Sequence, residues 1–298
     1  MSITKIHAPL AGALLSVVAI TLIAKFALSE RPGSGQVRRL ADPPGQGAIK
    51  RLRTLGRVEV DENQPARPVV KVFLSGRRVN DATLDLLGEL TELRELKLED
   101  TRVTDAGLRH LRHLTELRRL HLDGVEITDE GLAWLASLKN LDTLVLSDTR
   151  IDGTGLNHLT PLDRLRAVGI EGPLVTKEGL GHLTGLTMLG LWHTRLTDRG
   201  LEFLKRLPNL EQLILDDETV TFQGLAVLRA LPGLKTFYSS VRGSILEFEE
   251  FRRANPNIQI NGPTCGHAQV MRETELESRR LRRQGLTGRI RLAWGRIW

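Results

Sequence analysis

The sequence predicts an α/β solenoid of stacked coils, each with a short strand on a concave face, parallel to its neighbours, and a helix on the convex face. Three observations support this fold class: a repeat of fixed length, apolar–polar alternation early in each repeat, and regularly spaced leucines later in it. The strand core recurs every 24 residues, then after 21 and again after 24, at Leu74, Leu98, Leu122, Leu146, Ile170, Leu191 and Leu215.

The step of 21 residues marks one shortened coil. Leu180 and Leu191 are 11 residues apart, whereas Leu108 and Leu122 are 14 apart. Three residues, about one helical turn, are therefore missing from the outer part of this coil. We expect the convex side to be thinner there and the local curvature to change.

One repeat, "LRELKLEDTRVTDAGLRHL" (93–111), illustrates the expected elements. Leu96 and Leu98 alternate with Lys97, so the two leucines face one side of a strand and Lys97 faces the other. Further on, leucines recur every three residues, which favours one face of a helix. Thr104 or Asp105 stands just before that helix and is predicted to cap its first turn.

A glycine recurs near the start of each expected helix. Glycine costs about 1 kcal/mol relative to alanine in such a position. Its repetition therefore predicts that a Cβ would collide with the neighbouring coil. The six positions are Gly107, Gly131, Gly155, Gly179, Gly200 and Gly224.

The pattern LxxLxLxxTxVTDxGLxxL resembles the leucine-rich repeat, in the variant with Thr where many members have Asn or Cys. It is similar to the repeats of bacterial leucine-rich-repeat proteins and of F-box-type leucine-rich-repeat adaptors. The resemblance covers roughly residues 69–240. It implies a protein-binding scaffold and does not specify a partner.

The ends of the chain differ in composition from the repeats. Residues 1–28 predict a signal peptide or a membrane anchor, residues 29–46 a flexible linker, residues 47–262 the repeat domain with its caps, and residues 263–298 a basic tail. The apolar stretch 6–28 is long enough to span a membrane, and small residues near Ser29 offer a cleavage site. A cleaved signal, a retained anchor and a non-membrane helix all remain open. We expect an exported or membrane-anchored protein whose repeat domain is extracytoplasmic.

Two further segments predict the caps. "AIKRLRTLGRVEV" (48–60) indicates a helix followed by a strand, and "ILEFEEFRRANPNIQI" (245–260) indicates an amphipathic helix, a turn and a final strand. Capping is expected because the end coils of a solenoid would otherwise expose their core.

Positive charge is concentrated in the two ends. The whole chain has a net charge of +6, with nine Lys/Arg against three Asp/Glu in residues 1–60 and eight Arg against three Glu in residues 272–298. Residues 61–271 therefore carry a net charge of −5. This distribution argues against a nucleic-acid binder. The tail is interpreted as a solvated segment, with a membrane-surface segment as the alternative because Arg289, Arg291, Arg296, Trp294 and Trp298 mix cations with aromatic residues.

No pattern in the sequence predicts catalysis, a cofactor or a metal site. His110, His158 and His182 share one repeat position with a tryptophan, a phenylalanine and a valine, which indicates a packing position. Motifs for phosphate loops, nucleophile elbows and HExxH zinc sites are absent from the sequence. The single cysteine, Cys265, excludes a disulfide within the chain.

The concave sheet remains as the candidate binding surface. The central outward column of the strands is predicted to place Val145, Ile214 and Tyr238 beside Trp192 of the next column, forming an apolar patch in which Gly169 and Gly190 leave room for a partner. An acidic rim is expected from Glu99, Asp123, Glu171 and Asp216, beside Asp100, Asp148 and Asp217. The alternative for both is an ordinary solvated face.

These observations favour a non-enzymatic, protein-binding scaffold of an exported or membrane-tethered protein. The expected partner is an unidentified protein with Lys or Arg at its edge, with membrane contact through residues 6–28 if that segment is uncleaved. The chain's own Arg-rich stretch, 279–296, is a candidate competitor for the acidic rim. A cytosolic adaptor presenting substrates to a ubiquitin-ligase-like assembly is the main alternative, and an enzyme with an unrecognised site is the second.

Overall fold

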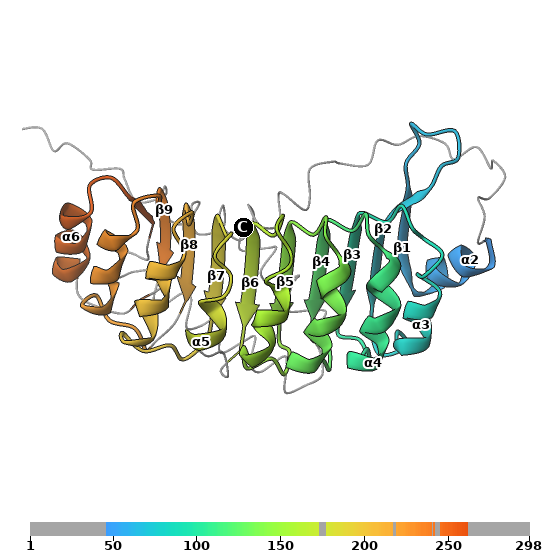
Figure 1. Ribbon diagram of the computed structural model, residues 1–298, viewed down its shortest axis with the longest axis horizontal. Coiled ribbons are helices and arrows are strands. Elements are labelled where there is room, and N and C mark those ends of the chain that lie inside the picture. Colours follow the sequence, from blue (N-terminus) through green and yellow to red (C-terminus); the bar gives the residue numbers. More distant parts are fainter. Residues whose placement is uncertain (1–45, 173–176, 217–218, 240, 242–244, 262–298) are drawn as a thin grey trace, which may run out of the picture.

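The computed structural model describes residues 46–172, 177–216, 219–239, 241 and 245–261. Within them, one sheet contains ten strands whose spatial order follows the sequence (Figure 1). The strands are β1 (Gly56–Val60), β2 (Val69–Ser75), β3 (Glu95–Glu99), β4 (Arg119–Asp123), β5 (Thr143–Ser147), β6 (Ala167–Glu171), β7 (Met188–Trp192), β8 (Gln212–Asp216), β9 (Thr236–Ser239) and β10 (Gln259–Asn261). β1 is antiparallel to β2, and all later neighbours are parallel.

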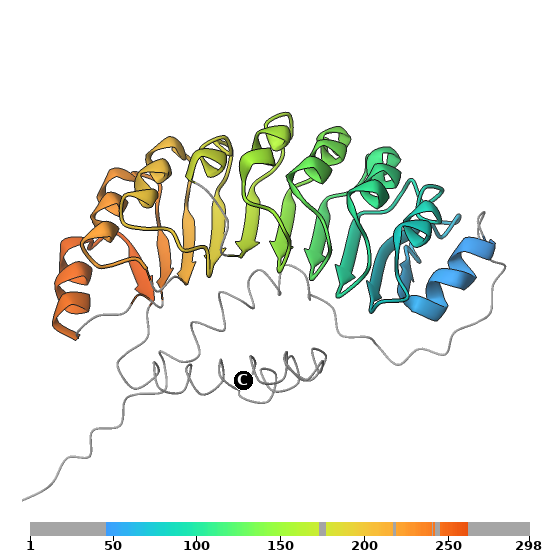
Figure 2. The ribbon, with the colours of Figure 1, turned by 90° about the horizontal axis from the view of Figure 1, so that it is seen from below.

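Helical segments cover the outer side of this sheet. Figure 2 shows the coils arranged in an arc, with the strands on the inner side and the helical turns on the outer side. The α-helices are α2 (Gln46–Leu55), α3 (Asp81–Asp85), α4 (Asp105–Leu108), α5 (Lys177–Leu180) and α6 (Ile245–Ala254). The 3₁₀ helices are η1 (Arg109–His113), η2 (Asp129–Ser137), η3 (Thr154–Leu159), η4 (Gly200–Arg206) and η5 (Gly224–Ala230). The predicted solenoid is confirmed.

Most of the convex segments are 3₁₀ helices, not the α-helices that the pattern suggested. The reason is visible in the leucine spacing. Leu108, Leu111 and Leu114 are three residues apart, and all three are fully buried. A 3₁₀ helix has three residues per turn, so it keeps such a row on one face, whereas an α-helix of 3.6 residues per turn rotates it away.

The strands stack in continuous register, which brings equivalent leucines into rows. Leu98 of β3 pairs with Leu122 of β4, which pairs with Leu146 of β5. Leu96 and Leu98 are fully buried, as the alternation predicted. The result is one continuous aliphatic core that runs through every described coil.

Different side chains close the two ends of the core. On α2, Ile49 and Leu52 are buried in the shared core. At the other end, Phe251 of α6 packs against Phe237 and Phe222, with ring centroids 6.1 and 5.8 Å apart. The core of the coils is almost entirely aliphatic. At its C-terminal end, large aromatic side chains cover the last row of leucines.

The repeated Thr-Asp pair ties each coil to the next. Both oxygens of the Asp81 carboxylate accept hydrogen bonds from Thr104, one from its N–H and one from its hydroxyl, at 2.8 Å each. Asp105 holds Thr128 in the same way, at 2.8 and 2.6 Å. Hydrogen bonds to a charged acceptor are stronger than neutral ones. We call each such carboxylate-to-next-coil contact a rung.

The predicted capping role of the Thr104 and Asp105 side chains is therefore wrong. Thr104 occupies the N-cap position of α4, but its side chain makes no capping hydrogen bond. It donates instead to the previous coil, and Asp105 accepts from the following one. A single repeat viewed alone cannot reveal partners that lie 23 residues away.

The predicted glycine collisions are present in five of the six coils. A Cβ on Gly131 would lie 2.2 Å from Oδ1 of Asp105. Comparable contacts with the previous coil, between 1.7 and 2.3 Å, exist at Gly107, Gly155, Gly179 and Gly224. Gly200 differs, because its nearest neighbour is Leu196 of its own coil at 3.1 Å. At four of these positions the atoms beneath the glycine belong to a rung aspartate, and at Gly179 they belong to the backbone of Gly153.

The rungs are interrupted in the middle of the solenoid. Gly153 and Lys177 occupy the positions where the other coils have an aspartate. The rung returns between Asp198 and Thr221, at 2.8 Å to the N–H and 2.7 Å to the hydroxyl. The shortened coil follows directly after this interruption.

Truncation of the leucine core is expected to be costly. Leu122→Ala should lower the free energy of unfolding by roughly 2–5 kcal/mol, because it removes buried area and leaves a cavity. Urea denaturation followed by circular dichroism measures this loss. Glu130→Ala, at an exposed position on the neighbouring turn, is the control and should change stability by no more than about 0.5 kcal/mol. Equal losses for both variants would contradict the core assignment.

The two kinds of glycine should respond differently to alanine. Gly131→Ala forces a Cβ against the Asp105 carboxylate and should cost about 1–3 kcal/mol, as overpacking does. Gly200→Ala meets only the flexible end of Leu196 and should be neutral or slightly stabilising, since alanine favours helix. The same denaturation assay compares them, and a larger loss for Gly200→Ala would refute the rung explanation.

Candidate binding surface on the concave face

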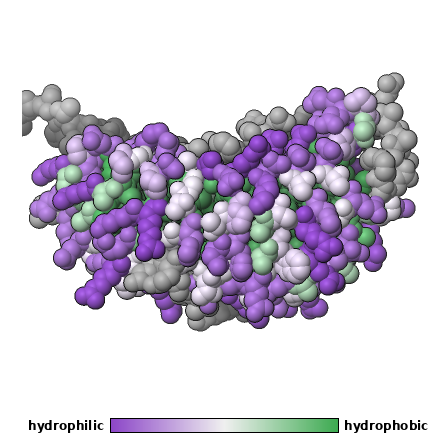
Figure 3. All heavy atoms as spheres, in the orientation of Figure 1, coloured by the Kyte–Doolittle hydropathy of each residue, from purple (hydrophilic) through white to green (hydrophobic). Residues whose placement is uncertain are grey.

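The outer face offers little apolar surface for a partner. Figure 3 shows that the face seen in Figure 1 is largely hydrophilic, with small separated apolar areas. Among the described residues, the one large apolar side chain classed as exposed is Trp134 of η2, at 41%. The strand columns of the concave face are therefore the main candidate surface.

The register places the predicted concave residues in two rows. In the central row, Val145 pairs with Gly169, Gly169 with Gly190, Gly190 with Ile214, and Ile214 with Tyr238. The second row contains Ser75, Glu99, Asp123, Ser147, Glu171, Trp192 and Asp216. Ser240, which the sequence placed last in this row, and Asp217 of the predicted rim lie outside the described residues.

Trp192 lies across the two glycines of the central row. A Cβ on Gly190 would be 2.2 Å from Cη2 of the indole, and a Cβ on Gly169 would be 3.0 Å from its Cζ3. The expectation that the glycines leave room for a partner is therefore wrong, because the indole of this chain already fills that room. The consequence is a half-buried indole that lies over the two glycines on the concave side of the sheet.

The remaining apolar residues lie on both sides of Trp192. We call Trp192 with Val145, Ile214 and Tyr238 the Trp192 platform. Ile214 and Tyr238 form a small cluster with Trp192, and both are buried, at 6% and 8% exposure. Burial raises the pKa of the Tyr238 hydroxyl above its ordinary value. On the other side, a Cβ on Gly169 would lie 3.8 Å from Cγ2 of Val145. The patch is therefore continuous from β5 to β9.

Two of the predicted rim carboxylates flank the indole. Glu171 of β6 and Asp216 of β8 are the direct register partners of Trp192. Both are half-buried. The ring Nδ1 of His193 lies 3.7 Å from Oε1 of Glu171, and the backbone N–H of His193 donates to the Asp216 carbonyl at 2.8 Å. The other two rim residues, Glu99 and Asp123, pair with each other on β3 and β4, several strands away.

Asp100 and Asp148 have a conformational reason to be where they are. Their φ angles are +51° and +50°, and the same repeat position in other coils is Gly76, Gly124 or Gly172, also with positive φ. Only glycine, and less readily aspartate or asparagine, adopts this left-handed region without large strain. The interpretation of these two carboxylates as part of a binding rim is therefore unnecessary.

A third row, which sequence reasoning missed, gives the N-terminal half of the concave face a different character. It runs through Lys71, Glu95 and Arg119. The fully buried Glu95 carboxylate lies 2.8 Å from Nη2 of Arg119 and 3.7 Å from Nζ of Lys97. The Lys97 ammonium is also 5.5 Å from the ring centroid of Phe73. This row could have been predicted from the sequence, because each of its residues precedes a residue of the central row by two positions and so faces the same side of the strand.

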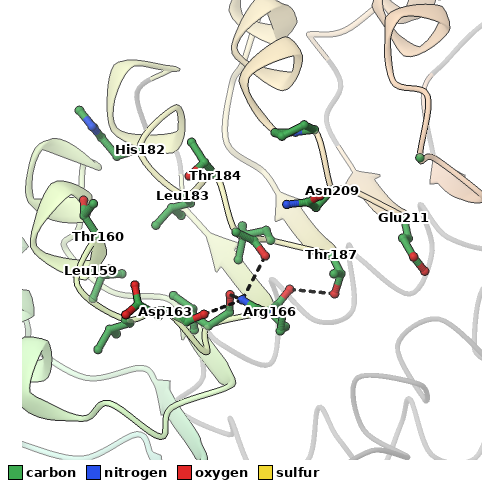
Figure 4. Close-up of a pocket in the computed structure, with 16 residues that line it drawn as sticks. Leu159, Thr160, Asp163, Arg166, His182, Leu183, Thr184, Thr187, Asn209 and Glu211 are labelled. Carbon is green, nitrogen blue, oxygen red and sulfur yellow. Dashed lines mark hydrogen bonds between the residues drawn. The ribbon is translucent and has the colours of Figure 1, made fainter.

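The shortened coil leaves a pocket of about 580 Å³ at the edge of the solenoid (Figure 4). Its wall combines the coils on both sides of the missing turn, from Leu159 to Arg166 and from Pro208 to Glu211, with residues 182–187 of the short coil between them. The expected thinning of the convex side thus appears as a local notch. The sheet remains in register beneath it.

Arg166 compensates for the missing turn. Its Nη1 donates to the carbonyls of Asp163, Leu165 and Gly185, at 2.8, 3.2 and 3.4 Å, and the hydroxyl of Thr187 donates to the Arg166 carbonyl at 3.3 Å (Figure 4). Guanidinium groups suit this role because they carry several donors in a fixed plane. The pocket therefore has a structural explanation, and the Arg166 guanidinium in its wall already donates hydrogen bonds to backbone carbonyls.

The predicted packing role of the histidine column is confirmed for Phe203 and Val227, which are buried, and is wrong for the histidines and Trp134. His158 and His182 are exposed, and Nδ1 of His110 lies 3.0 Å from the Asp85 carboxylate. Across the part of the chain that the structure describes, no group of three or more His, Cys, Asp or Glu side chains is arranged to hold a metal ion. In the same part, no helix is both long and apolar enough to cross a membrane. The predicted signal or anchor, residues 1–28, lies outside the described residues.

No family model matches the sequence, and no curated protein matches it. Solved structures similar to it include an internalin from Listeria monocytogenes, with a TM-score of 0.48, 20% identity, and coverage of 74% of this chain and 63% of that one. A leucine-rich-repeat protein of Leptospira interrogans has a TM-score of 0.47, 18% identity, and coverage of 75% and 58%. The chain thus spans less than two thirds of either protein. A third is the plant peptide hormone receptor RGFR1 in complex with RGF2, with a TM-score of 0.41, 18% identity, and coverage of 65% and 32%.

The fold assignment rests on the chain's own repeats and on its in-register sheet of stacked coils. The chain is a leucine-rich-repeat solenoid. In this leucine-rich-repeat solenoid, the concave rows are the part of each repeat that performs neither core packing nor coil-to-coil bonding. Their residues are therefore the ones most free to vary with a ligand.

One pair of carboxyl groups in the solenoid has opposite pKa shifts. Burial raises the pKa of Asp129, and the adjacent Asp152 carboxyl adds to this, against the N–H groups of Asp152 and Gly155 that lower it. The pKa of Asp152 is lowered, first by the N–H of Thr154 and then by its hydroxyl. Asp129 forms the last rung before the interruption. In this rung its partner is the N–H of Asp152, which stands where the other rungs have a threonine.

The Asp129 shift predicts a measurable pH dependence. A raised folded-state pKa stabilises the fold below the unfolded pKa, and this contribution is lost as pH rises through the folded pKa. Asp152 acts in the opposite sense, and the main causes of its lowered pKa, the Thr154 N–H and hydroxyl, remain in Asp129→Asn. We expect the parent to lose stability relative to Asp129→Asn as pH rises from about 4 to about 7, in urea denaturation. Asparagine also has one hydrogen-bond acceptor fewer than aspartate, so the test compares how the free energy of unfolding changes with pH and not its absolute value. Parallel curves for the two proteins would contradict the raised pKa of Asp129.

Proposed function

We propose that this protein is a non-enzymatic, protein-binding scaffold that receives its partner on the C-terminal half of the concave face. The observation that carries the proposal is the Trp192 platform. Its indole rests on a glycine backbone, continues into Ile214 and Tyr238, and is bordered by two carboxylates. A fixed aromatic surface of this kind loses little conformational entropy on binding.

The residues proposed as anchors follow from their chemistry. Tryptophan and tyrosine dominate interface energetics when they are desolvated by a partner. Trp192 is half-buried, whereas Tyr238 is already buried. We therefore assign the main contact to Trp192 and a supporting role to Tyr238, Ile214 and Val145.

The acidic residues select the partner's charge. Glu171 and Asp216 border the indole, and Glu99 and Asp123 lie further along the same row. A partner with Lys or Arg at its edge would associate faster with such a row, and its binding would weaken with salt. Nucleic acid is not proposed as a partner, because residues 61–271 have a net charge of −5.

We further propose that the protein is exported or membrane-tethered, on the basis of the apolar stretch 6–28. The alternative is a cytosolic adaptor presenting substrates to a ubiquitin-ligase-like assembly. Fractionation of C-terminally tagged protein separates the two. Recovery in the soluble cytosol with an intact N-terminus would favour the adaptor.

The enzyme alternative receives no support from the geometry of the described residues. A catalytic constellation brings a nucleophile or base together with a positioned partner. On the concave face, the buried Glu95 carboxylate is paired with Arg119 and Lys97, which gives its charge a structural explanation. We therefore propose binding without chemistry.

Binding through the platform predicts a specific pattern of losses. Trp192→Ala should weaken the affinity for a partner isolated with the full-length chain by at least tenfold, as loss of a hot-spot tryptophan does. Asp216→Lys should weaken it less and mainly at low salt, by slowing association. Trp134→Ala, on the exposed convex turn, and Asp163→Lys, at the solenoid edge, are the matched controls. Surface plasmon resonance measures all four; unchanged affinity for both concave variants would eliminate this surface.

A further inference from the structure

The indole of Trp192 and its two neighbours have the geometry of a site for an arginine side chain. The six-membered ring of the Trp192 indole lies over Gly190 and Gly169, and the side chain is half-buried on the concave side of the sheet. Glu171 and Asp216 stand in register on either side, about 10 Å apart for strands spaced at about 4.8 Å. A tryptophan face is the best aromatic partner for a cation, and guanidinium stacks on it while its edges bond carboxylates.

The end of the described chain lies close to this site. β10 pairs with β9 so that Asn261 is the register partner of Tyr238 in the central concave row. From there, β7 with its Trp192 is three strands away, roughly 15 Å. The described chain therefore ends on the concave sheet, in the central row and three strands from Trp192.

The length of the segment that follows, residues 262–298, is sufficient for any part of the sheet. It has 37 residues, which span about 120 Å when extended and about 55 Å when helical. Ten strands at about 4.8 Å cover only about 45 Å. Neither conformation prevents its arginines from reaching Trp192.

The composition of the segment matches the site in charge and in residue type. Residues 272–298 contain eight arginines, no lysine and three glutamates, for a net charge of +5 against the −5 of residues 61–271. Arginine is the cation that combines stacking with forked hydrogen bonding. Attachment to the same chain also gives the segment an effective concentration in the millimolar range, so weak individual contacts suffice.

We infer that the arginine-rich C-terminal segment, residues 272–298, docks on the concave face and places an arginine on the Trp192 indole between Glu171 and Asp216. As a regulatory device it rests on the proposed function: the segment occupies the surface offered to a partner. A partner must then displace it, and its apparent affinity is reduced by the fraction of molecules in which the surface is occupied.

Trypsin cleavage of the full-length protein tests the docking without any partner. Trypsin cuts after arginine, and a docked segment is protected in proportion to the fraction docked. Cleavage after Arg279 to Arg296, followed by mass spectrometry at low ionic strength, should be slow in the parent. It should be about fivefold or more faster in Trp192→Ala and in the double variant Glu171→Gln/Asp216→Asn, in line with the loss of a cation–π contact or of paired charges.

The matched controls are Trp134→Ala and Glu202→Gln, at exposed positions on the convex side. Both should keep the parent's cleavage rate. Raising the salt concentration should accelerate cleavage of the parent and leave Trp192→Ala and the double variant closer to unchanged, because the docked state depends on charge. Circular dichroism of every variant verifies that the solenoid is intact, and the double variant retains the tryptophan should Trp192→Ala disturb the sheet.

The proposal is overturned if the parent is cleaved rapidly at all salt concentrations, or if both concave variants are cleaved at the parent's rate. It is also overturned if vesicles of phosphatidylcholine and phosphatidylserine protect the segment equally in the parent and in Trp192→Ala, since the segment would then be a membrane-surface element. Partner affinity is a separate measurement. Loss of affinity in Trp192→Ala with unchanged cleavage would leave the proposed function intact and remove only the docking.

Discussion

The rung from one aspartate to the next coil is the interaction on which the regularity of this solenoid depends. Its two oxygens meet an N–H and a hydroxyl 23 residues later, as Asp105 meets Thr128. A coil of another length cannot satisfy both, so each rung fixes the period of the coil that it spans. It also fixes the glycine above it, because a Cβ on Gly131 would strike the carboxylate. Where Gly153 and Lys177 replace the aspartate, the length constraint is released, and there the chain loses three residues.

Much of this fold could be predicted from the sequence, because it depends on periodic features. The strand positions, the inward leucines and the glycine collisions all follow from repetition and alternation, as Leu96, Leu98 and Gly131 show. The role of Thr104 could not be predicted, because its partner Asp81 lies in another coil and local patterns suggest a cap. The helix type was not predicted: a leucine spacing of three is compatible with one face of an α-helix and is also the period of a 3₁₀ turn.

The concave surface was predictable in its rows but not in its side-chain directions. Register alone placed Trp192 between Glu171 and Asp216. That its indole would fold over Gly190 and Gly169 depends on a rotamer, which no spacing rule gives. Asp100 shows the opposite case. Its charge suggested a binding rim, whereas its positive φ is a sufficient reason for an aspartate at this position. Residue type identifies candidates, and backbone geometry decides which of them are available to a ligand.

The two irregularities of the solenoid occur on the same coil, and this has a physical consequence. The coil that ends in β7 lacks a turn on its outer side, where Arg166 bonds the carbonyls left beside the notch. On its inner side it carries Gly190 and Trp192, the center of the proposed platform. Repeats that follow every local rule are interchangeable, so a departure from those rules that the rest of the chain tolerates is where function is expected. Because Lys177 replaces the aspartate whose rung would span this coil, the coil can differ on its inner and outer sides at once, while the strand register that aligns Glu171, Trp192 and Asp216 is kept.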